Sequence, residues 1–488
     1  MKCAVAMNGV DIITFTAGVG EKSPYCRELI CKQLEFLGAK LDLSKNEIKG
    51  EEAVISTDNS KIVLCVVPTN EELMIAKETE KIINNWEEKM KILVLNCGSS
   101  SLKYQLINME TNDVLASGKY ERIGEEEAFI THKVNGQKIE IKHPALNHEE
   151  AIDFTLKQLI NPDYKVVDSL DEISAIGHRV VHGGEYFSSP VIITDEVIKK
   201  VDECAELAPL HNKAAVLGMK ACQSVMPGKP MVVVFDTAFH QTIPKERYIY
   251  PIPYEYYKKY GIRKYGFHGT SHMYVSNRLA EIENKPIEDL KIVTCHLGQG
   301  SSICAVKGGK SVDTSMGLTP LAGIPMVTRS GDLDPSVVTY IMKKENMTAS
   351  EVEDMLNKQS GVQGISGLAP DFRVIESESY TDNERAKIAM ESFKYAVASY
   401  IAKYAVAMNG IDAIVFTGGV GENQINIRKG ICKQLEFMGV IVDEEANNVR
   451  GEERLITKPE SKIRAYIIPT NEELMIAKET EKLVNYIK

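Results

Sequence analysis

The sequence has few of the features that mark secreted, membrane-spanning or nucleic-acid-binding proteins. Its ten cysteines include no Cys-x-x-Cys pair and form no compact secreted framework, which predicts reduced thiols rather than disulfides. No run reaches the roughly 18 apolar residues that a membrane-spanning helix requires. No dense Lys/Arg run offsets the net charge of -11, so the chain should repel phosphate backbones and anionic lipid. We therefore expect a cytoplasmic protein with neither nucleic acid nor membrane as a partner.

What the sequence does contain is typical of large globular proteins. Hydrophobic residues make up 44% of the chain and charged residues 26%, which excludes disordered and fibrous classes. A single hydrophobic core cannot organise 488 residues. The length therefore predicts about three domain-sized units, or two large domains with additions.

One segment of the chain occurs twice. Residues 4–82 align without a gap to residues 405–483 at a constant offset of 401. Within this match, residues 68–81 (PTNEELMIAKETEK) return letter for letter as residues 469–482. Solenoids need three or more adjacent repeats to bury a shared core, so two distant copies indicate a duplicated segment instead.

The pattern of both copies predicts α/β structure. Each copy has a strand-like apolar run, a glycine-rich turn, an amphipathic helix, a second strand and a closing helix. The first copy ends near Lys89, and residues 90–95 (MKILVL) look like a fresh protein start leading into a strand, so we place a domain boundary there. Further on, β-rich runs alternate with glycine turns and with helical patterns such as residues 384–404. This alternation favours a mixed α/β architecture with ligands gathered at strand ends.

Two motifs that follow predicted strands carry groups suited to anions. Residues 96–103 (NCGSSSLK) place glycine and hydroxyl residues in a tight turn, where N–H and O–H groups can meet phosphate and Lys103 adds charge. Residues 177–184 (GHRVVHGG) present Arg179, whose planar fork can bind a carboxylate or a phosphate bidentately. A plain Gly/Ser turn and a structural ion pair remain as alternatives for these two motifs.

An aspartate and two histidines come next along the chain. Asp236 directly follows an apolar run, at the carboxyl end of a predicted strand, where metal ligands commonly gather. His268 and His272 stand four residues apart, as a zinc pair on one helix would. Gly269 and Thr270 argue against a regular helix there, and no third ligand is evident. A histidine that hydrogen-bonds to a transferring phosphoryl group is the better interpretation.

Three later loops add glycines and a second arginine. They are residues 296–302 (HLGQGSS), residues 328–335 (TRSGDLDP), which contain Arg329, and residues 419–423 (GVGEN). Glycine lets a backbone approach a nucleotide closely. Several such turns together with two loop arginines fit phosphoryl transfer, which depends on positioning and on neutralising charge.

At these motifs the chain resembles the acetate kinase family of the actin-like superfamily. Residues 95–103 and 176–184 look like the family's two signature segments, and the similarity runs in order from Met90 to the C-terminus. The resemblance implies an α/β fold of two actin-like (ribonuclease H-like) domains with a cleft between them. The implied division is residues 90–240 as domain I, completed by a C-terminal helix at residues 475–488, residues 241–474 as domain II, and residues 1–89 as a partial duplicate of the second domain's C-terminal part.

The resemblance also implies the activity and the site. The expected reaction is reversible transfer of the γ-phosphoryl group of ATP to acetate, direct and in line, with Mg²⁺ or Mn²⁺. The implied catalytic residues are Arg179, Asp236, His268 and Arg329, and the implied acetate site consists of Arg179, Val181, Leu210, Phe267 and Pro320. Asn96 and Glu472, with Asp236, would arrange the metal. The implied ATP-binding residues are Lys103, His296, Gly298, Gln299, Gly300, Asp371, Phe372, Arg373, Gly419, Val420, Gly421 and Asn423.

Some positions depart from the family's usual residues and leave alternatives open. Gln299, Val327 and Pro370 stand where asparagine, glycine and serine are usual, so turnover could be reduced. One methylene in an apolar pocket shifts specificity by only about 1–3 kcal/mol, so a kinase that prefers propionate is a close alternative. A catalytically weak nucleotide-binding fusion protein is the alternative from another class. The resemblance further implies a homodimer formed through the second domain.

Overall fold

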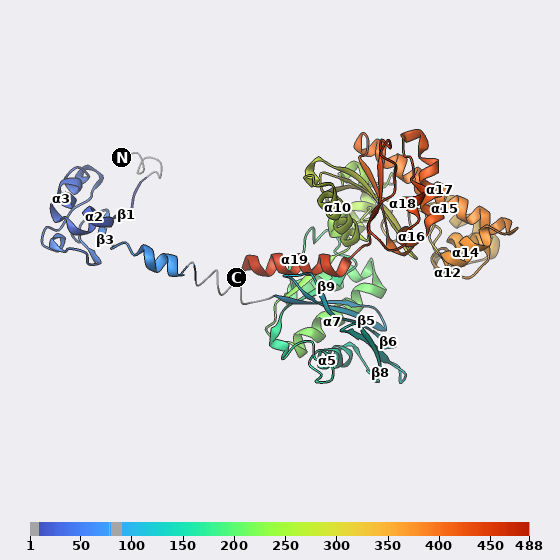
Figure 1. Cartoon of the computed structure of the whole chain (residues 1–488), viewed down its shortest axis with the longest axis horizontal. Helices are drawn as coiled ribbons and strands as arrows, with labels where there is room; N and C mark the ends of the chain where they lie inside the picture. The colour runs from blue at the N-terminus through green and yellow to red at the C-terminus, as the bar shows by residue number, and fades with distance from the viewer. Residues whose placement is uncertain (1–8, 78, 80–89, 488) are drawn as a thin grey trace. The chain divides into compact units, whose positions relative to one another are not determined.

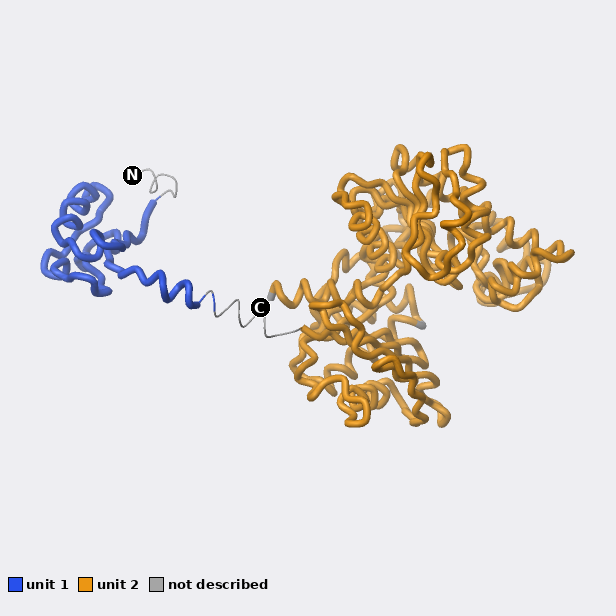
Figure 2. The backbone as a smooth tube through the Cα atoms, in the orientation of Figure 1, with its two compact units in different colours: residues 1–88 blue, residues 89–488 orange. Residues whose placement is uncertain are grey.

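The chain forms two units in the computed structural model, which describes residues 9–77, 79 and 90–487. Unit 1 spans Met1–Glu88 and unit 2 spans Lys89–Lys488 (Figure 2). This division lies next to the boundary that the sequence suggests at Met90, while the finer division of the kinase into two domains stays a prediction. Across the described residues, no helix has both the length and the apolar character needed to cross a membrane.

Unit 1 has its own sheet and its own small core. The sheet has the order β1-β3-β2, from β1 (Ile12–Phe15), β3 (Val63–Val66) and β2 (Ala53–Val54), with helices α2 (Ala17–Lys22) and α3 (Pro24–Lys32) after β1 (Figure 1). Arg27 on α3 is fully buried. Its Nε donates to Oδ1 of Asn46 at 2.7 Å, and its other nitrogens donate to backbone carbonyls of Gly20, Glu21, Asn46 and Ile48. Burial of this charge is tolerated because its donors are satisfied.

The second copy of the repeat has the same local structure inside unit 2. Its elements are β15 (Ala413–Thr417), α16 (Gly418–Asn423), α17 (Ile425–Gln434), β16 (Arg454–Leu455) and β17 (Arg464–Ile467), with strand order β15-β17-β16. Arg428 repeats the buried arginine, with Nε donating to Oδ1 of Asn447 at 2.8 Å. The segment's own sequence is therefore enough to specify its local fold.

The two copies differ in what covers them. Ile30 is 47% exposed and Ile75 is 66% exposed, whereas their counterparts Ile431 and Ile476 are 0% and 1% exposed. The second pair is buried by the rest of unit 2. Unit 1 therefore keeps an apolar surface that its counterpart buries, and apolar surface of this kind promotes association.

Unit 2 contains an eight-stranded sheet with helices on both faces. The strand order is β10-β11-β9-β4-β5-β6-β7-β8, from β4 (Lys91–Cys97), β5 (Ser101–Asn108), β6 (Val114–Glu121), β7 (Phe129–Val134), β8 (Gln137–Lys142), β9 (Ile173–Val180), β10 (Val191–Ile192) and β11 (Met231–Phe235). Strands β4, β9 and β11 are parallel, and β11 is buried on both faces, as its unbroken apolar run MVVVF predicts. Helices α5 (His148–Leu159) and α7 (Pro209–Val225) pack on one face, and α19 (Glu472–Ile487) packs on the other (Figure 1).

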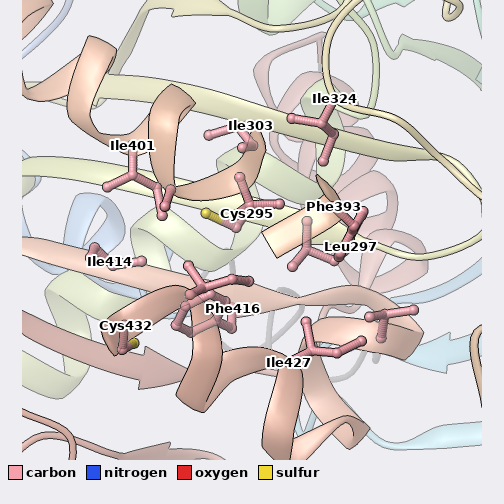
Figure 3. Packing of buried hydrophobic residues seen from close by; sticks show 14 of the residues in the cluster. Cys295, Leu297, Ile303, Ile324, Phe393, Ile401, Ile414, Phe416, Ile427 and Cys432 are labelled. Carbon is pink, nitrogen blue, oxygen red and sulfur yellow. The ribbon is translucent and has the colours of Figure 1, made fainter. Parts of the chain in front are cut away.

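A six-stranded sheet forms the second core of unit 2. Its order is β14-β13-β12-β15-β17-β16, with β12 (Lys291–Leu297), β13 (Ser301–Lys307) and β14 (Lys310–Thr314). Helix α15 (Glu384–Met408), predicted over residues 384–404, covers one face, where Cys295, Phe393 and Phe416 pack together (Figure 3). Helix α10 (Gly269–Glu283) covers the other face through Val275 and Leu279. The α/β prediction is confirmed.

The remaining elements are short or lie outside the sheets. The helices are α6 (Asp195–Glu203), α8 (Lys245–Tyr248), α9 (Glu255–Tyr260), α11 (Pro335–Glu345), α12 (Ala349–Lys358), α13 (Gly361–Ser366), α14 (Phe372–Ser379) and α18 (Glu444–Asn447). Single 3₁₀ turns are η1 (Glu35–Leu37), η2 (Lys45–Glu47), η3 (Leu170–Glu172), η4 (Cys204–Glu206), η5 (Ala238–Thr242), η6 (Ile287–Asp289) and η7 (Glu436–Met438). Helix α14 matters most here, because it lines a pocket described below.

One glycine of the second copy has no tolerance for a side chain. Gly418 has φ +76°, and a Cβ atom there would lie 2.7 Å from the backbone oxygen of Leu297. We expect Gly418→Ala to lose about 1–3 kcal/mol of local stability, measured as faster hydrogen exchange of the β15 amides. Ala17 occupies the equivalent position of unit 1, also at positive φ, so Ala17→Gly is the matched control and should stabilise unit 1 or leave it unchanged. Unchanged exchange in Gly418→Ala would contradict this account.

Candidate active site

Two neighbouring parallel strands bring Arg179 and Asp236 together. Arg179 lies on β9 opposite Val234 of β11, and Asp236 follows β11 directly. Nε and Nη2 of Arg179 donate to the two carboxylate oxygens of Asp236 at 3.0 and 2.6 Å. Burial opposes the charge of Arg179, but Asp236 and Glu472 more than offset this and raise its pKa. The ion pair that the sequence left as an alternative therefore exists, and it places a permanent cation beside two carboxylates.

Glu472 brings a partly buried carboxylate to the same place from the first turn of α19. Its Oε2 lies 3.9 Å from Nε of Arg179. Burial raises the pKa of Glu472 to about 7; Arg179 and Lys103 lower it, whereas Asp236 and Glu473 add to the rise. A carboxyl group whose pKa lies near neutral can lose its proton when a cation binds beside it.

These carboxylates and Asn96 suit a magnesium ion. Asn96 follows Leu95, which pairs with His178 next to Arg179 in the adjacent strand. Among the described residues, no group of three or more His, Cys, Asp or Glu side chains could enclose a metal by itself. Mg²⁺ usually binds through one or two carboxylates, waters and substrate phosphates rather than a complete protein cage. The oxygen groups of Asn96, Asp236 and Glu472 fit that pattern.

His268 sits in an unusual backbone conformation immediately before α10. Its φ is +57°, in the left-handed region that few non-glycine residues adopt. The expectation of no regular helix at this point is wrong, because α10 begins at Gly269. A Cβ atom at Gly269 would lie 2.2 Å from the backbone oxygen of Asp236, so glycine is needed for close packing and does not break the helix. His268 and His272 both bond to Ser302 and form no zinc pair.

His268 is kept neutral and lies close to both arginines. Burial lowers its pKa well below the ordinary value, and His296, His272, Arg179 and Arg329 lower it further. The ring of His268 stacks on that of His296 at a centroid distance of 4.2 Å. Burial also lowers the pKa of Arg329, which still stays cationic because an arginine titrates far above neutral pH. Arg179, His268 and Arg329 are thus brought together.

An apolar cluster adjoins Arg329. It consists of Phe267, Met316 and Met326, with Val181 packed against them. Nη1 of Arg329 donates to the backbone oxygen of Pro320 at 3.3 Å and lies 3.7 Å from Sδ of Met326. The sequence prediction named Val181, Phe267 and Pro320 but missed the two methionines, which no local pattern marks. Leu210 lies in α7, and its side chain is outside the described part of the structure.

A pocket of about 450 Å³ gathers most of the predicted nucleotide-binding residues. It is lined by Gly298, Gln299, Val327, Pro370, Asp371, Phe372, Arg373, Gly419, Val420, Asn423, Gln424 and Arg450. Nothing would meet a Cβ atom at Gly419 within 4 Å, so this glycine leaves open space. The prediction missed Gln424 and Arg450. The three departures Gln299, Val327 and Pro370 all line this pocket.

Four predicted ATP-binding residues lie elsewhere. The positive charge of Lys103 lowers the pKa of Glu472. The ring of His296 stacks on that of His268. A Cβ atom at Gly300 would lie 3.2 Å from Nη1 of Arg329, so this glycine borders the arginine. Gly421 packs against the backbone of Phe416. The first three are therefore associated with the charged groups and do not line the pocket.

His211 is a further member of the charged cluster that the sequence prediction missed. The side chain is exposed, but partial desolvation and the charges of Arg179 and Arg329 lower the pKa of His211, while Asp236 raises it. A single histidine at the start of a helix gives no sequence signal for such a role. Its position beside Arg179 depends on how α7 packs against β9 in the folded chain.

The fold and the site together define an α/β phosphotransferase of the actin-like type. The chain belongs to the acetokinase family, whose model matches residues 1–77 and 91–478. It is 59% identical over 400 residues to the acetate kinase of Thermoanaerobacterium thermosaccharolyticum, covering 82% of this chain and all of that protein. The predicted family, fold class and phosphoryl transfer to a carboxyl group are confirmed.

Two solved structures resemble unit 2 closely. The acetate kinase of Porphyromonas gingivalis has a TM-score of 0.79 and 47% sequence identity, covering 81% of this chain and 100% of its own. The propionate kinase of Francisella tularensis has a TM-score of 0.75 and 44% identity, covering 80% and 99%. Both acyl preferences therefore occur among close structural relatives.

Proposed function

We propose that the protein catalyses ATP + acetate ⇌ ADP + acetyl phosphate. The observation that carries this proposal is the position of Arg329: it borders the small apolar cluster around Phe267 on one side and the loop at Gly300 on the other. An arginine there can hold a carboxylate whose methyl group points into the cluster. The loop at Gly300 continues from Gly298 and Gln299, which line the nucleotide pocket. The proposed ATP site and the proposed acetate site thus meet at Arg329.

The transfer is proposed to be direct and in line. A carboxylate oxygen of acetate bonds to the γ-phosphorus of ATP while the bond from that phosphorus to the β,γ-bridging oxygen breaks, and ADP leaves with that electron pair. Arg179 and Arg329 neutralise charge on the transferring group and hold the carboxylate in position. His268 stabilises the equatorial oxygens by donating a hydrogen bond.

Asn96, Asp236 and Glu472 are proposed to hold Mg²⁺, or Mn²⁺ in its place. When bound, the ion screens phosphate charge and orients ATP. Arg179 keeps both oxygens of Asp236 in fixed positions. The partly buried carboxylate of Glu472 lies 3.9 Å from Nε of Arg179 and so borders the same place. These side chains would therefore hold the oxygen groups in position before the ion binds.

Nucleotide recognition is assigned to α14 and α16. Asp371 caps α14, its Oδ1 accepting from the N–H of Arg373 at 2.8 Å, and this fixes the segment 371–373 at the pocket. Asn423 is fixed on α16 through a bond from Nδ2 to the backbone oxygen of Gly419 at 2.9 Å. Pre-organised loops of this kind reduce the entropy lost on binding.

The assay that tests the proposal measures acetyl phosphate formed by the purified full-length protein from ATP and acetate. We expect turnover in the ordinary range for kinases, about 1–100 per second. A protein that binds ATP but forms no acetyl phosphate would be the nucleotide-binding fusion protein instead. A homodimer formed through the second domain and a cytoplasmic location are proposed on the family resemblance alone.

The acyl preference should depend on Val181. Val181→Ala enlarges the apolar cluster next to Arg329, and we expect the propionate/acetate ratio of kcat/KM to rise about tenfold. Val180→Ala is the matched control, since Val180 packs with Phe187 and Phe235 on another face and should leave the ratio unchanged. A ratio that stays constant or falls in Val181→Ala would remove Val181 from the acyl site.

A further inference from the structure

A layer of polar side chains fills the space between α10 and the β12–β13 hairpin beside the proposed phosphoryl site. Thr294 pairs with Cys304, and His296 pairs with Ser302, so these four residues share one face of the hairpin. From α10, Ser271 bonds to His296 at 2.8 Å and His272 bonds to both Thr294 and Ser302 at 2.7 Å. The layer is buried except for His296, which is half-buried, and its members depend on one another for hydrogen bonds.

Ser302 joins two histidines through one oxygen atom. Its Oγ lies 2.9 Å from Nδ1 of His268 and 2.7 Å from Nε2 of His272. A serine hydroxyl has one proton, so it can donate to only one of these nitrogens and must accept from the other. The choice of which nitrogen carries the proton in one ring therefore fixes the same choice in the other ring. Ser302 couples the tautomers of His268 and His272.

Thr294 ends this chain of hydrogen bonds. Its Oγ1 lies 2.7 Å from Nδ1 of His272 but 3.5 Å from the backbone oxygen of Cys304. The hydroxyl has one proton, and an O–H···O bond is normally about 2.5–3.0 Å long, so the carbonyl of Cys304 is a poor acceptor at 3.5 Å and Nδ1 of His272 is the good one. When the hydroxyl of Thr294 donates to His272, that ring holds its proton on Nε2 and donates to Ser302. Ser302 is then left to donate to Nδ1 of His268.

The ring nitrogen of His268 that does not bond to Ser302 is Nε2, and it faces the proposed phosphoryl site. A Cβ atom at Gly300 would lie 3.7 Å from Nε2 of His268 and 3.2 Å from Nη1 of Arg329, so both atoms border the same small region. Phosphoryl oxygens are hydrogen-bond acceptors only. A bare lone pair on Nε2 would repel them, whereas an N–H there would bind them.

We propose that Ser302, supported by His272 and Thr294, holds His268 as the Nε2–H tautomer that donates to the transferring phosphoryl group. Ser302 is a positioning residue: it touches no substrate and acts through His268. The inference rests on the proposed function, because the role of His268 does. It extends that function by naming what makes a neutral histidine a hydrogen-bond donor in the required direction.

The first experiment compares Ser302→Ala with Ser311→Ala in the full-length protein. Ser302→Ala should lower kcat about ten- to a hundredfold while KM for acetate and for ATP changes less than about threefold. Ser311 is the matched control, because it makes the same type of bond to a buried histidine, Nδ1 of His240 at 2.8 Å, but makes none to His268. Ser302→Thr, which keeps the hydroxyl, should recover most of the lost kcat. Equal losses in Ser302→Ala and Ser311→Ala would overturn the proposal.

The second experiment observes the tautomer itself. In protein labelled with ¹⁵N-histidine, the His268 signals, assigned by their loss in His268→Ala, should show a protonated Nε2 and a bare Nδ1. Ser302→Ala, or the isosteric Thr294→Val, should shift protonation toward Nδ1. A wild-type spectrum with protonated Nδ1 would overturn the proposal even if Ser302→Ala failed to fold.

A double-variant comparison separates this inference from the proposed function. If Ser302 acts through His268, adding Ser302→Ala to His268→Ala should lower kcat by less than about twofold. A further full loss in the double variant would mean that Ser302 acts elsewhere. If His268→Ala alone left kcat unchanged, the proposed role of His268 would fail first, and the tautomer measurement would then stand as a separate structural finding.

Discussion

Replacing Arg329 with alanine should lower kcat by about two to five orders of magnitude, the range expected when a cation facing a transferring phosphoryl group is lost. Arg329 lies beside His268, Pro320 and Met326, and its charge has no carboxylate partner within 4 Å among the described residues. Its removal therefore leaves no buried acid without a partner. The loss should be in catalysis rather than in folding, and steady-state kinetics with a thermal melt will distinguish the two.

Arg179→Ala should cause a comparable loss of kcat, but with an added cost in stability. Its guanidinium pairs with both oxygens of buried Asp236, and removal would leave that carboxylate without its partner. Arg385→Ala is a suitable control, since Arg385 donates to backbone carbonyls of Gly364 and Ile365 and to none of the proposed site residues, and its activity should stay within about twofold of wild type. Near-normal turnover of folded Arg329→Ala would exclude that arginine from the mechanism.

Glu472→Gln should abolish most activity, whereas Glu71→Gln should leave it nearly unchanged. The two glutamates hold the same position in the two copies of the repeat, 401 residues apart. Glu472 is partly enclosed next to Arg179 and Asp236, and burial raises its pKa. Glu71 is exposed in unit 1. We expect kcat to fall about a hundredfold or more in the first variant, because it removes a charge at the proposed metal and phosphoryl site.

The same reasoning predicts that a chain beginning at Met90 is fully active and more soluble. It keeps every proposed site residue and loses the exposed apolar side chains of unit 1, such as Ile30 and Ile75. Activity and light scattering of the two chains side by side provide the measurement. If Glu71→Gln were the damaging change, or if the shorter chain were inactive, unit 1 would be a working part of the active site.

Much of the fold could be predicted from local signals. The apolar run at residues 231–235 predicted a strand, and the pattern at residues 384–404 predicted the long helix α15. Asp236 could be placed at a strand end for the same reason. The constant offset of the repeat predicted matching elements, and β1 and β15 have matching pairings with β3 and β17. These features depend on short stretches of sequence, where periodicity is informative.

The parts of the site that could not be predicted depend on register between distant segments. Ser302 meets His268 and His272 only because β13 packs under α10, and nothing in the sequence states that alignment. Gly269 suggested a break in a helix, yet it is needed for its close approach to Asp236. Met316 lines the apolar cluster from a loop without a pattern. Three-dimensional packing overrides local preference in each case.

The methyl group of Ala17 has a consequence for how the chain assembles during synthesis. The first copy of the repeat leaves the ribosome before β12 is made, so an early segment of related sequence is present when the six-stranded sheet is still incomplete. A side chain at the position of Gly418 would lie 2.7 Å from the backbone of Leu297, and Ala17 brings that side chain. Mispairing by the early copy is therefore penalised, whereas the later copy fits without strain. One methyl group discriminates between two competing partners in the nascent chain.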